Sequence, residues 1–160
     1  MKLSLTSKPE IVNRPVIHYV YHQKNGPFAE VAPSAWGEFF PLLGNQLSHN
    51  QMVGLLGLSM VDKGKNGEAA GVYQAGAGLA SKPATIPKNL QYRKIEAGKY
   101  ARFLLTGSYS QIGTAFSQIF RTLSENSVPL REDFCVENYL NDPKSTPEEQ
   151  LLTELLVPIG

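Results

Sequence analysis

The feature that most constrains the fold is a pattern that occurs twice, roughly eighty residues apart. In each copy, a segment rich in β-branched and aromatic residues precedes a glycine turn and then a helical pattern. The first copy has its strand at 16–21 and its turn at 26–27, and the second has them at 99–105 and 107–108. The repetition indicates an internal duplication. We therefore expect two similar halves, about 1–85 and about 86–160.

The helix of the second copy is the best-defined element of the sequence. Its apolar side chains recur at intervals of three and four residues and form one stripe, made of Ile112, Phe116, Ile119, Phe120 and Leu123. Ser108 or Ser110 can supply the capping oxygen at its start. The helix of the first copy contains Pro41, which we expect to kink or shorten it because proline lacks an amide donor.

Further strands are expected after each helix. In the first half, the apolar run 52–60 leads to a hairpin turn around 63–67 and a strand at 68–79 that is poor in side-chain bulk. In the second half, the segments 134–140 and 153–159 have strand composition. Between them, Thr146 and Glu149 are spaced as a capping box, with Pro147 at the first helical position.

Composition restricts the classes of function. The 160 residues are 42% hydrophobic, which is enough for a sizeable core, and the formal charge of +1 argues against a general binder of polyanions. A single cysteine excludes a disulfide framework and a cysteine-based zinc site. No apolar stretch approaches the roughly 20 residues of a membrane span, and the first residues lack the apolar core of a secretory signal. We expect a cytoplasmic protein.

Three segments near the C-terminus join a turn, a helix start and a strand at fixed spacing: 137–143 (ENYLNDP), 145–149 (STPEE) and 153–159 (TELLVPI). With the segments 70–79 and 98–107, they resemble the GyrI-like effector-binding domains. The resemblance implies one α+β domain over residues 1–160. It would consist of tandem β-α-β-β halves related by pseudo-twofold symmetry, with helices packed on antiparallel sheets and a ligand groove between the halves.

The resemblance also implies a function. Such domains sense drugs and other small organic molecules in AraC-type and MerR-type bacterial regulators, and this chain is similar to their standalone form. It would bind aromatic and cationic organic molecules as a sensor or sequestering protein. Two alternatives stay open, a hydrolase of cyclopropane-type genotoxins and a gyrase-inhibitor-like module whose partner would be DNA gyrase. We expect no cofactor, no nucleic acid and no membrane as partner.

Glu137 is the first candidate for the binding site. Strand alternation places it on one face with Cys135 and Tyr139, where a carboxylate beside an aromatic ring would attract a cation or act as an acid or base. Related domains place an acidic residue at the matching position. The other candidate ligand contacts are aromatic residues that offer apolar area and, for Tyr and Trp, a polar tip; they are Trp36, Tyr73, Tyr139, Tyr19, Tyr109 and Phe103.

Two other residue types carry weaker signals. His18 and His22 would lie on the same side of a strand, but no third ligand is near in sequence, so we expect no metal site. Cys135 has no histidine partner in its sequence context, and we expect a buried, inert thiol.

Overall fold

The computed structural model describes residues 3–61 and 70–160, and it divides the chain into two compact units. The central unit is Pro15–Ala97, and the terminal unit combines Met1–Arg14 with Gly98–Gly160. The N-terminal segment is therefore grouped with the second half of the chain. In this respect the structure departs from the predicted halves, which divide the sequence once, near residue 85.

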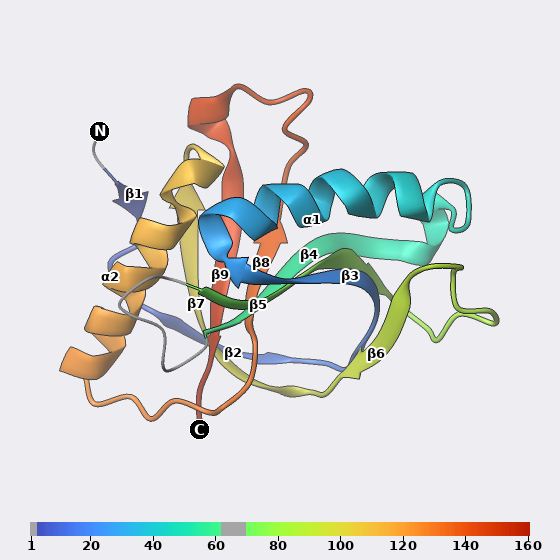
Figure 1. Cartoon of the computed structure of the whole chain (residues 1–160). Coiled ribbons are helices and arrows are strands. Elements are labelled where there is room, and N and C mark those ends of the chain that lie inside the picture. The colour runs from blue at the N-terminus through green and yellow to red at the C-terminus, as the bar shows by residue number, and fades with distance from the viewer. Residues whose placement is uncertain (1–2, 62–69) are drawn as a thin grey trace. The chain divides into compact units, whose positions relative to one another are not determined.

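The central unit is one antiparallel sheet with a helix on one face (Figure 1). Its strands follow the order β4-β5-β3-β6 across the sheet. In chain order its elements are β3 (Ile17–Pro27), α1 (Phe28–Leu43), the short 3-10 helix η1 (His49–Gln51), β4 (Met52–Val61), β5 (Ala70–Leu79) and β6 (Gln91–Ile95).

Alternation along β3 decides which side chains meet α1. Val20 lies in the apolar core beneath the helix, whereas Tyr19 and Tyr21 point to the opposite face. The helix side of this core consists of Val31, Ala35, Phe39 and Leu43, each four residues after the one before. The face of β5 toward α1 carries Tyr73, Ala75, Ala77 and Leu79, and its small alanines leave room for the helix.

The terminal unit repeats the same plan. Its sheet has the order β1-β7-β9-β8, with β2 also paired to β7. In chain order its elements are β1 (Ser4–Leu5), β2 (Glu10–Arg14), β7 (Gly98–Thr106), the 3-10 helix η2 (Tyr109–Gln111), α2 (Ile112–Glu125), β8 (Cys135–Tyr139), the 3-10 helix η3 (Glu148–Gln150) and β9 (Leu152–Pro158).

Strand pairing shows that the two units share one topology. In the central unit, β3 precedes α1 and pairs with β5, which also pairs with β4. In the terminal unit, β7 precedes α2 and pairs with β9, which also pairs with β8. Each unit thus contains a β-α-β-β module, the arrangement that the family resemblance implies. Among the residues that the structure describes, no helix is long and apolar enough to cross a membrane.

The local predictions have mixed outcomes. The apolar stripe of α2 is confirmed, since Ile119 and Leu123 are buried and the other three members pack against the same core. Ser108 caps the short helix η2, where its side chain accepts a hydrogen bond from the Ser110 amide. The predicted serine cap of α2 is wrong, because Gln111 is the N-cap of α2 and no side chain caps this helix. Despite Pro41, α1 continues to Leu43, where it ends against Gly44.

The predicted capping box at Thr146 is wrong. Pro147, not Thr146, is the N-cap of η3, and no side chain caps this element. A three-residue 3-10 turn needs fewer amide partners than an α-helix, so the cap has little to satisfy. The predicted hairpin turn at 63–67 lies outside the described residues.

Candidate functional site

A buried carboxylate on β8 is the centre of the candidate site. Glu137 pairs with Leu155 of β9, which belongs to the core beneath α2, so the carboxylate lies on the α2 face of the sheet. Its exposed fraction is 6%. The Tyr139 hydroxyl donates a hydrogen bond to Glu137 Oε1 at 2.5 Å. The predicted sharing of one strand face by Cys135, Glu137 and Tyr139 agrees with this geometry.

A turn at Gly107 brings a second phenol to the same place. Gly107 has φ 125°, a conformation that favours glycine, and its amide donates to the Leu151 carbonyl at 2.8 Å. Tyr109 follows in η2, and its ring centroid lies 5.2 Å from that of Tyr139. The Tyr109 Oη is shielded from solvent and has no hydrogen-bond partner among the described residues. Burial, followed by the charge of Asp142, raises the pKa of Tyr109.

Thr153 on β9 is a further candidate for the site, and the sequence did not single it out. It is fully buried and pairs with Tyr139 across the strands. Within the described part of the chain, its hydroxyl also finds no hydrogen-bond partner. Strand alternation places Thr153 on the same face as the core residues Leu155 and Val157. In the sequence, the signal that could have identified Thr153 is a hydroxyl residue that alternates with the apolar residues Leu155 and Val157.

The pKa of the neighbouring thiol, that of Cys135, depends in part on the charge of Glu137. The pKa of Cys135 is raised to about 12, chiefly by burial and then by the negative charges of Glu137 and Asp133. The thiol therefore stays protonated at neutral pH. The side chain is half-buried, whereas the sequence predicts a buried one.

The opposite face of the same strands carries an ion-pair network. Arg102 contacts both Glu154 and, at 3.0 Å, Glu10 of β2, and Asn138 donates to Glu154 at 2.6 Å. Burial alone would raise the pKa of Glu154, but the hydrogen bonds from Arg102 and Asn138 outweigh burial and lower it. Asn138 lies between Glu137 and Tyr139 in β8, and its hydrogen bond joins this strand to Glu154 of β9 on the opposite face of the sheet.

Two aromatic candidates of the central unit, Trp36 and Tyr73, are hydrogen-bonded to each other. Trp36 Nε1 donates to the Tyr73 hydroxyl at 2.8 Å, on the α1 face of the sheet, and the Phe28 ring lies 6.4 Å from that of Tyr73. Tyr73 is almost fully buried and Trp36 is partly buried. The pair presents an indole and a phenol on one helix-covered face.

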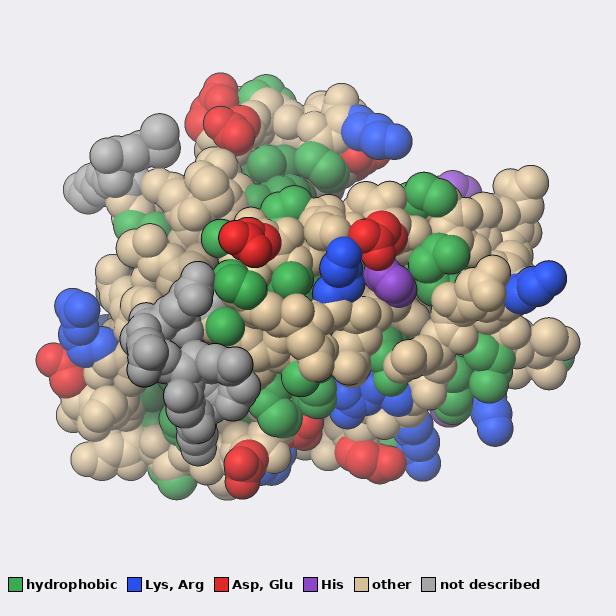
Figure 2. All heavy atoms as spheres, viewed as in Figure 1, with side chains coloured by type: hydrophobic (Ala, Val, Ile, Leu, Met, Phe, Trp, Pro, Cys, Tyr) green, Lys and Arg blue, Asp and Glu red, His purple; other side chains and the backbone are tan. Residues whose placement is uncertain are grey.

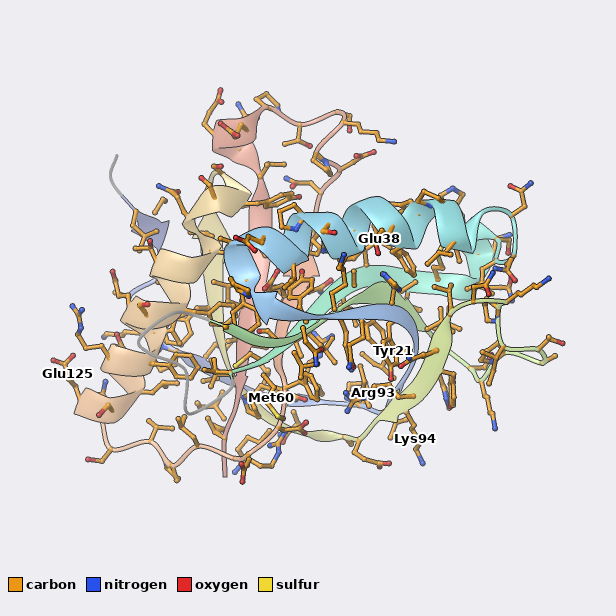
Figure 3. The ribbon with its side chains drawn as sticks, in the orientation of Figure 1. Tyr21, Glu38, Met60, Arg93, Lys94 and Glu125 are labelled. Atoms are coloured by element: carbon orange, nitrogen blue, oxygen red, sulfur yellow. The ribbon has the colours of Figure 1, made fainter. Side chains whose placement is uncertain are left out.

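Two other candidates, Tyr19 and Phe103, are buried, one in each unit. Tyr19 is fully buried on the face away from α1, and its hydroxyl donates to the carbonyls of Leu56 and Gln74 at 2.7 and 3.1 Å. Figure 3 shows its stacking neighbour Tyr21 on that side, away from Glu38 of α1. Phe103 lies in the core beneath α2 with 1% of its surface exposed. The structure thus brings Glu137, Tyr139 and Tyr109 together, and it places Trp36 with Tyr73.

A polar cluster spans β3 and α1. Glu38 accepts hydrogen bonds from Lys24 at 2.8 Å and Ser34 at 3.1 Å, and it bonds to His22 at 2.7 Å. These hydrogen bonds, that of Lys24 first, lower the pKa of Glu38 to about 2. The other strand histidine, His18, is hydrogen-bonded to Tyr92. In the described residues, no three His, Cys, Asp or Glu side chains are grouped to hold a metal ion.

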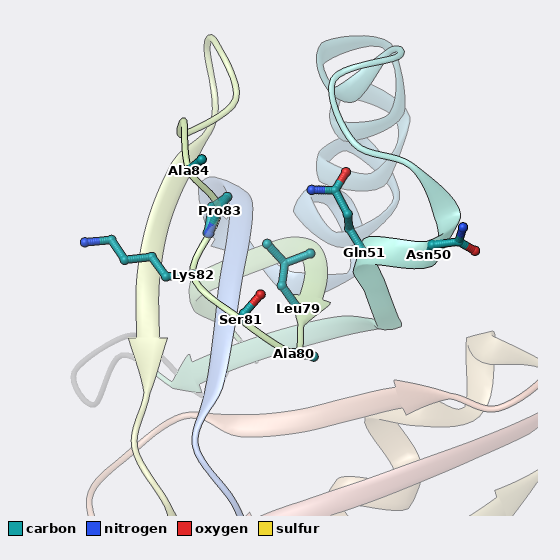
Figure 4. A pocket seen from close by; sticks show the side chains of 8 residues that line it. All are labelled: Asn50, Gln51, Leu79, Ala80, Ser81, Lys82, Pro83 and Ala84. Carbon is teal, nitrogen blue, oxygen red and sulfur yellow. The ribbon is translucent and has the colours of Figure 1, made fainter.

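A cavity of about 310 Å³ lies elsewhere in the central unit, at the end of β5 (Figure 4). Asn50 and Gln51 lie on one side of it and Ser81 on the other, while the Lys82 side chain points away. None of the predicted site residues lines this cavity. On the face shown in Figure 2, basic and acidic side chains are intermixed, in keeping with the even charge of the chain.

These features define a class, the α+β proteins built from two β-α-β-β modules. Here one module holds a buried carboxylate among tyrosines. The chain belongs to the GyrI-like family, because the signature described as the GyrI-like small molecule binding domain matches residues 7–160. The family resemblance predicted from the sequence is confirmed. No curated protein matches the chain significantly.

Solved structures share the fold at low sequence identity. SAV2435 bound to tetraphenylphosphonium has a TM-score of 0.72 and 11% identity, over 96% of this chain and 94% of that one. The EcmrR C-terminal domain gives 0.69 and 16%, over 100% and 99%. An integron cassette protein from Vibrio cholerae gives 0.68 and 12%, with both chains fully covered. This chain spans 57% of the EcmrR chain in its complex with DNA.

Proposed function

We propose that this protein binds small aromatic organic cations, and that the Glu137 carboxylate supplies the charge that selects them. The observation that carries the proposal is the position of this carboxylate. It is 6% exposed and hydrogen-bonded to Tyr139, whose ring contacts that of Tyr109. A carboxylate shielded from water attracts a cation more strongly than one in solvent, and aromatic faces attract cations as well.

Two findings support this choice within the family. The family is one of small-molecule-binding domains. The residues of the candidate site then indicate which kind of molecule this chain binds. One protein of the same fold, SAV2435, is described as bound to tetraphenylphosphonium, which is itself an aromatic cation. The candidate contacts Trp36 and Tyr73 in the central unit stay a prediction of this proposal.

The test compares a cation with a neutral ring system of the same shape. The probes are 10-methylacridinium and acridine, titrated at pH 8, where acridine is neutral. Glu137→Gln removes the charge but keeps an oxygen that can accept the Tyr139 hydrogen bond. We expect this variant to bind 10-methylacridinium about tenfold more weakly, which corresponds to about 1.4 kcal/mol, and to bind acridine as the parent does.

Glu125→Gln is the matched control, because Glu125 is an exposed residue at the end of α2 and its substitution changes the net charge equally. If Glu137→Gln binds the cation as tightly as the parent does, the Glu137 carboxylate is not part of the binding site. The binding constants are measured by isothermal titration calorimetry, and a thermal scan of each variant checks that it is folded.

A further inference from the structure

Two hydroxyl groups of the terminal unit stand out because neither has a hydrogen-bond partner among the residues that the structure describes. Thr153 is fully buried, and the Tyr109 Oη is shielded from solvent; in the described part of the chain, both hydroxyls are unpaired. Natural proteins pair nearly all their buried polar groups, so each exception requires an explanation. These two are the unpaired buried side-chain groups found in the described residues, and both belong to one unit.

The two hydroxyls also lie around one residue of the candidate site. Thr153 pairs directly with Tyr139 across β8 and β9, and the Tyr109 ring lies 5.2 Å from the Tyr139 ring. Tyr139 in turn donates its hydrogen bond to Glu137. Two unused oxygen acceptors therefore flank the residue that contacts the buried carboxylate. A hydroxyl oxygen accepts hydrogen bonds through its lone pairs, and a cation that carries N–H groups can donate them.

We infer that Thr153 and Tyr109 are specificity-determining residues of the Glu137 site. Their hydroxyl oxygens accept hydrogen bonds from the N–H groups of a bound aromatic cation. The site accordingly favours aromatic cations that carry amino or amidino groups over those without N–H. This inference rests on the proposed function, since it concerns the same site and names the chemical class of its ligand.

The experiment uses two planar tricyclic cations of similar size, 9-aminoacridinium, which carries N–H donors, and 10-methylacridinium, which carries none. The test variants are Thr153→Val, which replaces the hydroxyl by a methyl group of similar size, and Tyr109→Phe. We expect the parent to prefer 9-aminoacridinium. Each variant should lose about tenfold in affinity for 9-aminoacridinium and less than about twofold for 10-methylacridinium.

Matched controls come from the same unit. Thr106→Val and Tyr100→Phe remove the same groups from β7, at positions that alternate with Phe103 and Leu105 and so face away from α2. They should leave both affinities unchanged. An equal loss of both probes in Thr153→Val and Tyr109→Phe, or no loss of either, would overturn the inference.

The stability of the ligand-free variants separates a ligand contact from a structural one. Replacing an unpaired buried hydroxyl by a group of similar shape does not destabilise a fold. Thr153→Val and Tyr109→Phe should therefore unfold at or above the parent's midpoint temperature while they bind 9-aminoacridinium less well. A lowered midpoint would show that the hydroxyl is satisfied in the free chain, which overturns the inference. If the parent binds neither cation, the proposed function itself fails.

Discussion

At the residue scale, β8 places a thiol, a carboxylate and a phenol on one strand face at alternate positions. Cys135 precedes Glu137, and Tyr139 follows it with a hydrogen bond to the carboxylate. Burial is the first cause of the raised pKa of Cys135, and the negative charge of Glu137 is the second. A chemical property of the thiol is therefore a measure of the charge at the site.

We predict that Cys135 alkylates very slowly. With a pKa of about 12, only about one thiol in ten thousand is ionised at pH 8, and the thiolate is the reactive form. Removing the negative charge in Glu137→Gln lowers this pKa, so the reaction with iodoacetamide at pH 8 should become several times faster. The exposed control Glu125→Gln should leave the rate at the parent's value. An unchanged rate in Glu137→Gln would mean that the carboxylate carries no charge in the folded chain.

At the element scale, the close packing of β5 against β3 depends on Gly76. A Cβ at this position would lie 2.2 Å from the Val20 carbonyl oxygen and 2.9 Å from the Tyr19 ring. The backbone oxygen cannot move without shifting β3. At Gly78, by contrast, a Cβ would meet only side-chain atoms, the nearest at 3.2 Å. In this strand, glycine is therefore required at position 76, whereas position 78 can accept a small side chain.

We predict that Gly76→Ala lowers the free energy of unfolding by about 3 kcal/mol, because the added methyl group overpacks the sheet against backbone. Gly78→Ala should cost about 1 kcal/mol or less, since the neighbouring side chains can yield. Urea unfolding followed by circular dichroism measures both. Similar losses in the two variants would contradict the role given to the Val20 carbonyl.

The elements themselves were largely predictable from periodicity, whereas their partners were not. The stripe of α2 and the strand around Glu137 follow from spacing that is local in the sequence. The unpaired hydroxyl of Thr153 depends on which side chains surround it, and no local pattern specifies them. Likewise, the opposite faces of Tyr19 and Tyr73 follow from the register between β3 and β5, which the sequence does not state.

At the scale of the whole molecule, the chain does not divide once in the middle. Residues 1–14 belong with residues 98–160, because β1 and β2 both pair with β7. The side chains reinforce this pairing, since Glu10 of β2 contacts Arg102 of β7. Glu10 and Arg102 are also neighbours in the strand register.

We predict that deleting residues 1–14 damages the terminal unit selectively. The amides of β7 should exchange with deuterium about tenfold faster or more, because the strand loses its partners on one side, while those of β3 and β5 keep their rates. Mass spectrometry of peptides from the exchanged protein locates the change. Faster exchange in β3 and β5 to the same degree would show that the two units do not respond separately.

The pairing of β1 and β2 with β7 also affects how the chain folds during its synthesis on the ribosome. The strands β1 and β2 are synthesised before their partner β7, and the whole central unit lies between them in the sequence. The central unit is contiguous and can fold as it leaves the exit tunnel. Until β7 has been made, β1 and β2 have no strand partner from it. In nascent chains stalled before Gly98, these two strands would therefore be accessible to chaperones.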